Sequence, residues 1–62
     1  MADKTYDIAI VGAGPIGLSV AIYSRKMGMS PLLIDAIEYR NEFAQSLGFT
    51  AVSPNMMANH SG

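Results

Sequence analysis

Three glycines and one carboxylate are the residues of this chain whose types and spacing suit a chemical task. Gly12, Gly14 and Gly17 form a G-x-G-x-x-G pattern after one apolar run, and Asp35 closes a second apolar run. Gly12 allows a tight turn, and Gly14 has no side chain to keep a pyrophosphate from the backbone. Gly17 lets a helix pack closely, and the Asp35 carboxylate accepts hydrogen bonds from ribose hydroxyls. The pattern indicates that the chain binds a nucleotide through its pyrophosphate and its ribose.

Two predicted strands hold these groups at one edge of a sheet. The nearly continuous apolar run of residues 6–11 predicts a strand buried on both faces of a parallel sheet. Leu32 to Asp35, opened by Pro31, predicts the second strand. Because crossovers between parallel strands are right-handed in nearly all proteins, the two strands should be parallel neighbours. The glycine turn and Asp35 then meet at the same carboxyl edge, where ligands bind in open α/β sheets.

A helix is expected between the strands, from Gly14 to about Met27. Pro15 suits its first position, because the N–H that proline lacks has no intrahelical partner there. The free N–H groups and the positive end of the helix dipole then face the phosphates. The face turned to the sheet is expected at Leu18, Ala21 and Ile22.

The order strand, turn, helix, strand and acid predicts an α/β fold, a Rossmann-like β-α-β unit for FAD or NAD(P). The alternative is an ordinary β-α-β unit whose glycines only make a turn. The stretch of residues 1–62 is expected to be one partial dinucleotide-binding domain, because this fold normally needs well over 100 residues. The cofactor-binding residues are predicted to be Gly12, Ala13, Gly14, Pro15, Ile16, Gly17, Asp35 and Ala36.

The tail, residues 36–62, is the least determined part of the chain. Residues 38–47 predict a short helix or, equally, a flexible loop with one helical turn; a helix places Tyr39, Phe43 and Leu47 on one face. Residues 49–52 predict a short extended piece. Ser53 then resembles an N-cap with proline at the first helical position, which predicts a second short helical segment through residue 60.

Outside the glycine turn, no residue qualifies as a catalytic group, and no cluster suits a metal. His60 has no carboxylate or cysteine partner at a useful spacing, and Ser19 and Ser24 lie inside the predicted helix without a base. Arg40 could reach a ribose or a phosphate from beyond Asp35, but a solvated loop arginine is the favoured interpretation. In a cofactor-dependent enzyme the cofactor supplies the chemistry, so the absence of such residues is no contradiction.

Composition excludes several classes of partner. The chain has no cysteine, which excludes a disulfide framework, and its net charge of −1 argues against nucleic acid or an anionic membrane. No apolar run approaches the roughly 20 residues of a membrane span, and no signal peptide is recognisable. A cytoplasmic location is expected. The missing remainder of its own domain is the expected partner, together with a small-molecule substrate.

The stretch DIAIVGAGPIGLSVAIYSRKMGMSPLLID, about half of the chain, resembles the N-terminal FAD-binding segment of flavin-dependent oxidoreductases. GxGPxGL near the N-terminus, with an acid after the second strand, is more similar to an FAD site than to an NAD site. The resemblance implies that FAD is bound through its ADP half, with the three glycines at the pyrophosphate and Asp35 at the ribose. NAD(P)H is then the co-substrate of the longer enzyme.

Two flavoprotein families fit this segment. The tail SLGFTAVSPNMMANHSG resembles aromatic-ring hydroxylases of the p-hydroxybenzoate hydroxylase type, although Ala36 and Ile37 stand where that family often has a basic residue. This resemblance, which we favour, implies an NAD(P)H-dependent flavin monooxygenase that hydroxylates an organic substrate. The alternative is a reductase similar to thioredoxin reductase, but the Gly-Gly pair usual after the acid is missing. A third reading is a non-catalytic nucleotide-binding fragment or a truncated reading frame. We expect the 62-residue chain alone to be inactive.

Overall fold

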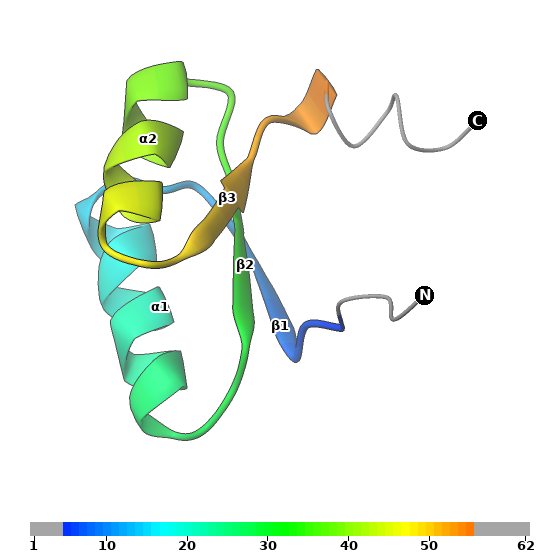
Figure 1. The fold of residues 1–62 in the computed structure, drawn as a ribbon, viewed down its shortest axis with the longest axis vertical. Coiled ribbons are helices and arrows are strands. Elements are labelled where there is room, and N and C mark those ends of the chain that lie inside the picture. Colours follow the sequence, from blue (N-terminus) through cyan, green and yellow to red (C-terminus); the bar gives the residue numbers. More distant parts are fainter. Residues whose placement is uncertain (1–4, 56–62) are drawn as a thin grey trace.

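A parallel sheet with two helices makes up the computed structural model, which describes residues 5–55 (Figure 1). The elements alternate along the chain, and the strand order is β1-β2-β3. This architecture confirms the Rossmann-like α/β class predicted from the glycine pattern. The elements are β1 (Ile8–Val11), α1 (Pro15–Lys26), β2 (Pro31–Ile34), α2 (Glu38–Ser46) and β3 (Thr50–Val52).

The three strands bring the carboxyl ends of β1 and β2 to one edge. Val11 pairs with Ile34 in the parallel register, and the N–H of Gly12 donates to the Ile34 carbonyl at 2.7 Å. β1 begins at Ile8, two residues later than predicted, and β2 begins at Pro31, with Asp35 directly after its end. The glycine turn and the acid are therefore neighbours across the sheet edge, as the sequence predicts.

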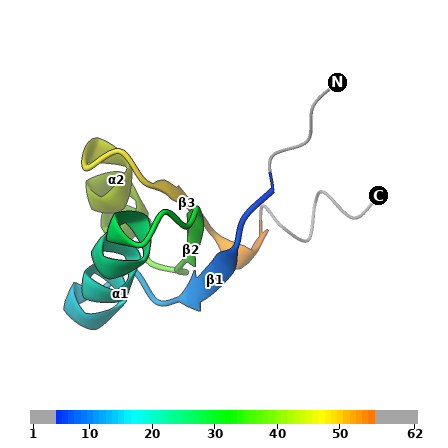
Figure 2. The same cartoon turned by 90° about the horizontal axis from the view of Figure 1, so that it is seen from below.

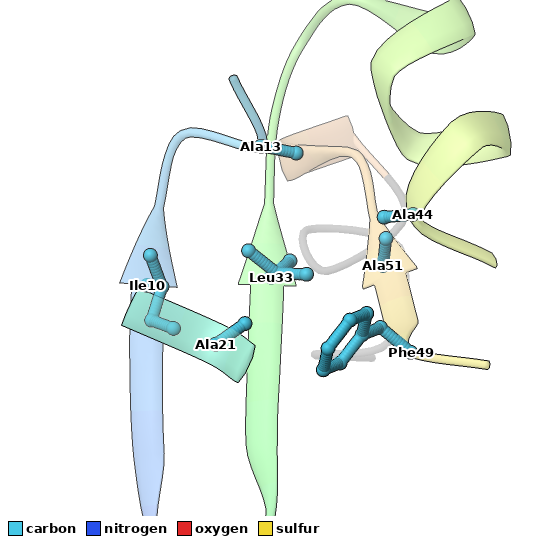
Figure 3. Packing of buried hydrophobic residues seen from close by; sticks show 7 residues of the cluster. All are labelled: Ile10, Ala13, Ala21, Leu33, Ala44, Phe49 and Ala51. Carbon is cyan, nitrogen blue, oxygen red and sulfur yellow. The ribbon is translucent and has the colours of Figure 1, made fainter. Parts of the chain in front are cut away.

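Both helices cover the same face of the sheet, as Figure 2 shows. Ile10 on β1 is buried beneath them, whereas Val11, which points to the other face, is 86% exposed. The prediction that β1 is buried on both faces is therefore wrong for the described residues. The covered face forms the core around the fully buried Leu33 (Figure 3), and its buried apolar residues are Ile10, Ala13, Ala21, Leu33, Ala44, Phe49 and Ala51.

Helix α1 starts and ends where the sequence predicts. Pro15 occupies the first turn, and Gly28 after the helix has φ +83°, a conformation that favours glycine. The N–H of Met29 donates to the Ser24 carbonyl at 3.0 Å and that of Gly28 to the Arg25 carbonyl at 2.9 Å, which satisfies the last turn. The small side chain of Ala21 is fully buried against the sheet, and Leu18 packs against the core. Ile22 is instead exposed, because the sheet meets a narrower face of the helix than predicted.

Helix α2 forms, but it packs through a different face from the predicted one. Tyr39, Phe43 and Leu47 are 68%, 56% and 44% exposed, whereas Asn41 and Ala44 are buried. The sheet accepts this side of α2 because small and amide side chains let the helix lie close to β2 and β3. The predicted apolar face instead lies away from the sheet, and Tyr39 and Phe43 line a groove that begins at the start of α1.

The loop between α2 and β3 is tied to the end of α1 by Arg25. Its Nη2 donates to the Gly48 carbonyl at 2.8 Å, and the guanidinium carbon lies 3.8 Å from the centroid of the Phe49 ring. This contact orients the short extended piece predicted for residues 49–52, which forms β3.

The predicted helix after Ser53 begins at Pro54 and Asn55, and the rest of it, including His60, lies outside the described residues. Neither helix of the described part is long and apolar enough to cross a bilayer.

Candidate functional site

Asp35 is the centre of the candidate site because all of its polar groups are bonded to neighbouring elements. Its carboxylate accepts the Ala13 N–H at Oδ2 (2.8 Å) and the Ile37 N–H at Oδ1 (2.7 Å). Its own N–H donates to the Val52 carbonyl at 3.1 Å, and its carbonyl accepts the Asn41 amide at 2.6 Å. The side chain therefore ties the glycine turn to the start of α2. Each carboxylate oxygen keeps a second lone pair for a ligand hydroxyl.

The first and third glycines shape the turn because neither position accepts a side chain easily. Gly12 has φ +113°, a conformation that L side chains rarely adopt, with open space where a Cβ would stand. A Cβ built on Gly17 would lie 1.8 Å from the Gly12 carbonyl oxygen. Gly17 therefore lets α1 press against the turn itself, which confirms the packing role predicted for it.

Gly14 stands at the open side of the turn, where α1 begins. Its φ is −79°, and a Cβ built on it would meet only the Arg40 guanidinium, at 3.7 Å. The first helical bond runs from the Leu18 N–H to the Gly14 carbonyl at 2.9 Å, so the N–H groups of Ile16 and Gly17 have no intrahelical partner. No acidic side chain lies in the first turn of α1. This end of the helix suits a phosphate group.

Arg40 brings a positive charge to the site. Its Nη1 lies 3.6 Å from Oδ2 of Asp35, and its side chain is partly buried over Gly14. A hydrogen bond with the Tyr39 side chain, and then the attraction of Asp35, raises the pKa of the guanidinium above its ordinary value. The interpretation of Arg40 as a solvated loop arginine is therefore wrong, since it covers both the acid and the open glycine.

The Asp35 carboxylate is held in its charged form. The backbone N–H groups of Ala13 and Ile37 lower its pKa most, and Arg40 lowers it further against the opposing effect of burial. A carboxylate that accepts several backbone hydrogen bonds ionises more readily than one in water. At neutral pH the site therefore presents a negatively charged hydrogen-bond acceptor beside a helix terminus that suits a phosphate.

Three of the eight predicted site residues line one groove. Ala13, Gly14 and Pro15 share a groove of about 630 Å³ with Leu18, Tyr39, Arg40 and Phe43. The Ile16 side chain is strongly exposed at the start of α1, so only its backbone faces the turn. Ala36 lies on the far side of Asp35, in a polar cavity of about 400 Å³ between α2 and β3.

Sequence reasoning undervalued one residue and missed another. Arg40 was considered but not favoured, because a sequence does not show that the first turn of α2 folds back over the glycine turn. Asn41 was not considered at all, although it supports the Asp35 backbone. Its signal was an amide two residues from both Tyr39 and Phe43, on the opposite side of the helix from the predicted apolar face, which periodicity alone does not distinguish from a solvated position.

The serine hydroxyls of α1 are bonded within their own helix. The hydroxyls of Ser19 and Ser24 donate to carbonyls of their own helix, at 2.9 and 2.8 Å. Within the described residues no group of three or more histidines, cysteines or carboxylates could hold a metal ion. What these residues offer is N–H donors, a carboxylate and a guanidinium, with a groove of about 630 Å³ beside Gly14 and Arg40.

Comparison with known proteins finds oxidoreductases. A thioredoxin reductase from Aquifex aeolicus is 44% identical over 48 residues, which are 77% of this chain and 14% of that protein. Ferredoxin–NADP reductase 2 from Sulfolobus acidocaldarius is 64% identical over 33 residues, 53% of this chain and 10% of that protein. An uncharacterized zinc-type alcohol dehydrogenase-like protein from Haemophilus influenzae is 49% identical over 41 residues, 66% of this chain and 12% of that protein.

The chain thus spans only 10–14% of the length of these curated relatives. No protein-family model and no solved structure matches it. The relatives confirm the coarse prediction, a Rossmann-type FAD/NAD(P)-binding segment of an oxidoreductase. The predicted cofactor, FAD with NAD(P)H as co-substrate, agrees with the two reductases.

Proposed function

We propose that the chain is the ADP-binding unit of an FAD-dependent, NAD(P)H-oxidising reductase similar to thioredoxin reductase or ferredoxin–NADP reductase. The observation that carries this proposal is the 2.8 Å hydrogen bond from Ala13 to Asp35. It holds a ribose acceptor against the turn where a pyrophosphate fits, which is the pair of contacts that an ADP group needs. When bound, FAD supplies the electron transfer.

Different residues of this chain bind different parts of the ADP group. The open space at Gly14 admits the pyrophosphate, and the N–H groups of Ile16 and Gly17 at the start of α1 face it. The free lone pairs of Asp35 accept the ribose hydroxyls. Arg40 lies over both positions, so a ligand engages its guanidinium as it enters. Charge-assisted bonds between arginine and phosphate are stronger than its screened ion pair with Asp35.

A reductase has more support than the hydroxylase that the tail resembles. The hydroxylase interpretation depended on the pattern of residues 46–62, whereas the thioredoxin reductase match covers 77% of the chain. The ferredoxin–NADP reductase match is shorter and reaches 64% identity. In a reductase of either kind, the longer protein passes electrons from NAD(P)H through the flavin to a disulfide or to ferredoxin.

A second candidate function is the NAD-binding unit of a dehydrogenase. The observation that favours it is the 49% identity over 41 residues with the zinc-type alcohol dehydrogenase-like protein. The proposed contacts of the site are with an ADP group alone. FAD and NAD share this group, so the geometry of the site suits both cofactors equally. The two cofactors, FAD and NAD, differ in the group that is attached to the distal phosphate.

The test is to purify the protein as its gene encodes it and to identify the bound nucleotide by absorbance and mass spectrometry. The apoprotein is then titrated with FAD, NAD⁺ and ADP by calorimetry. The reductase proposal expects FAD to bind at least as tightly as ADP and much more tightly than NAD⁺. Tighter binding of NAD⁺ would support the dehydrogenase instead. Binding of none of the three would overturn both.

A further inference from the structure

Asn41 is a buried amide on α2 that no part of the proposed function uses. It is only 6% exposed, and its Nδ2 donates to the Asp35 carbonyl at 2.6 Å. We propose that Asn41 is a positioning residue that sets the orientation of the Asp35 carboxylate for the ribose. This inference rests on the proposed function, because it assigns a task to Asn41 only if Asp35 binds a nucleotide.

The position of Asp35 explains why it needs such support. It follows the last residue of β2, and its N–H still donates to Val52 of β3 at 3.1 Å. The Asp35 carbonyl points to the same side, and the pairing of β2 with β3 ends at Ile34 and Val52, so this carbonyl lies beyond the strand ladder. The Asn41 side chain donates a hydrogen bond to this carbonyl instead. It thereby fixes the peptide plane from which the chain turns into α2.

That peptide plane controls both bonds of the carboxylate. Two residues farther along, the Ile37 N–H donates to Oδ1 at 2.7 Å, while Oδ2 faces the Ala13 N–H at 2.8 Å. A rotation of the plane between residues 35 and 36 would move the Ile37 N–H away from Oδ1. Asn41 therefore acts on the ribose acceptor through the backbone, without reaching the ligand itself.

Stability alone does not explain an amide at this place. The Oδ1 of Asn41 is buried and has no hydrogen-bond partner within the described part of the chain. A buried acceptor without a partner destabilises a fold, whereas an apolar side chain of the same shape avoids that loss. Residues that cost stability are often kept because a binding site needs them. Within the described residues, the side chain of Asn41 donates its hydrogen bond to Asp35.

The test compares Asn41→Leu with a matched control, Gln45→Met, in the protein as its gene encodes it. Gln45 also lies on α2, and its Nε2 donates to a strand carbonyl at 2.8 Å, but that carbonyl belongs to Ala51. Both variants replace an amide with an apolar side chain of similar size. Three quantities are measured for each: the thermal midpoint, the affinity for ADP, and the titration midpoint of the Asp35 carboxyl by carbon-13 NMR.

We expect Asn41→Leu to keep or raise the thermal midpoint while it weakens ADP binding by about tenfold, as loss of a supporting hydrogen bond behind a binding group often does. The Asp35 titration midpoint rises toward that of an ordinary aspartate. Gln45→Met changes neither the affinity for ADP nor the Asp35 titration midpoint. If leucine is not accommodated, Asn41→Met replaces it. Failure of both Asn41 variants to fold, while Gln45→Met folds, would show a purely structural role and overturn the proposal.

The outcomes separate this inference from the proposed function. If the unaltered protein does not bind ADP, the proposed function fails, and the positioning role fails with it. If the protein binds ADP and Asn41→Leu binds it equally well with an unchanged Asp35 titration, only the role of Asn41 is overturned.

Discussion

The Asp35 carboxylate and the Ala13 backbone N–H, 22 positions apart in the sequence, are joined by a hydrogen bond of 2.8 Å. The bond crosses from the end of β2 to the turn after β1. It makes the Asp35 carboxylate part of the structure of the glycine turn. A substitution of Asp35 therefore alters the turn as well as the ribose contact.

Gly14→Val should abolish dinucleotide binding without unfolding the protein. Its φ of −79° is open to any residue, and a Cβ there meets only the movable end of Arg40. A valine side chain would instead fill the space that the pyrophosphate needs. The loss should exceed that of Asp35→Ala, which leaves the space at Gly14 open. Cofactor content and the thermal midpoint of both variants check this; a Gly14→Val protein saturated with FAD would contradict it.

Gly12→Ala and Gly17→Ala should both destabilise the fold, but by different amounts. At Gly12 a Cβ has free space, so only the strain of φ +113° opposes it, about 1–3 kcal/mol. At Gly17 a Cβ would overlap the Gly12 carbonyl oxygen, which forces α1 away from the turn. Denaturant unfolding of the two variants measures the difference. Equal stability of both would show that α1 does not press on the turn as described.

Only strong acid should loosen the site, because the pKa of Asp35 is lowered from its ordinary value. Because backbone hydrogen bonds lower the pKa of Asp35 in the folded protein, the bonds contribute full stability above the unfolded value of about 3.9. That contribution is lost as the pH falls through the lowered folded pKa. Thermal unfolding of the unaltered protein and of Asp35→Asn between pH 7 and strong acid tests this. The difference between them should shrink as the pH falls; a constant difference would contradict the account.

The glycine pattern predicted the fold and the shape of the glycine turn because each position meets a local conformational requirement. Gly12 needs a positive φ, Pro15 suits a first turn, and Asp35 ends an apolar run. These requirements depend on a few neighbouring residues and can therefore be recognised in the sequence. The pairing of the two strand ends follows from the handedness of the crossover.

The faces of the helices were harder to predict, because they depend on what lies opposite. Periodicity placed Phe43 and its neighbours on one side of α2, but the sheet required small and amide side chains such as Ala44 and Asn41. The partial burial of Arg40 also depends on tertiary structure, since α1 and α2 must meet before the guanidinium reaches Gly14. Neither relationship leaves a local signal.

The site should prefer a ribose with a free 2′-hydroxyl over one with a 2′-phosphate. The charged Asp35 repels a phosphate, and the two residues directly after it, Ala36 and Ile37, carry no positive charge. Arg40 offsets part of this repulsion, so Arg40→Gln should weaken ADP binding and make it less sensitive to salt. Calorimetry with ADP and adenosine 2′,5′-bisphosphate checks both statements. Equal affinity for the two nucleotides would show that Asp35 does not face the ribose.

The most direct test of the central claim is an ADP titration of the protein labelled with nitrogen-15 glycine and alanine. The account predicts saturable shifts of the amide signals of Gly12, Ala13, Gly14 and Gly17, together with Ala36 beside the acid. Signals of Gly28 and Gly48, at the far ends of the helices, should stay in place. Saturation with shifts only at these distant glycines, or no shift at the turn, would contradict the claim that it holds an ADP group.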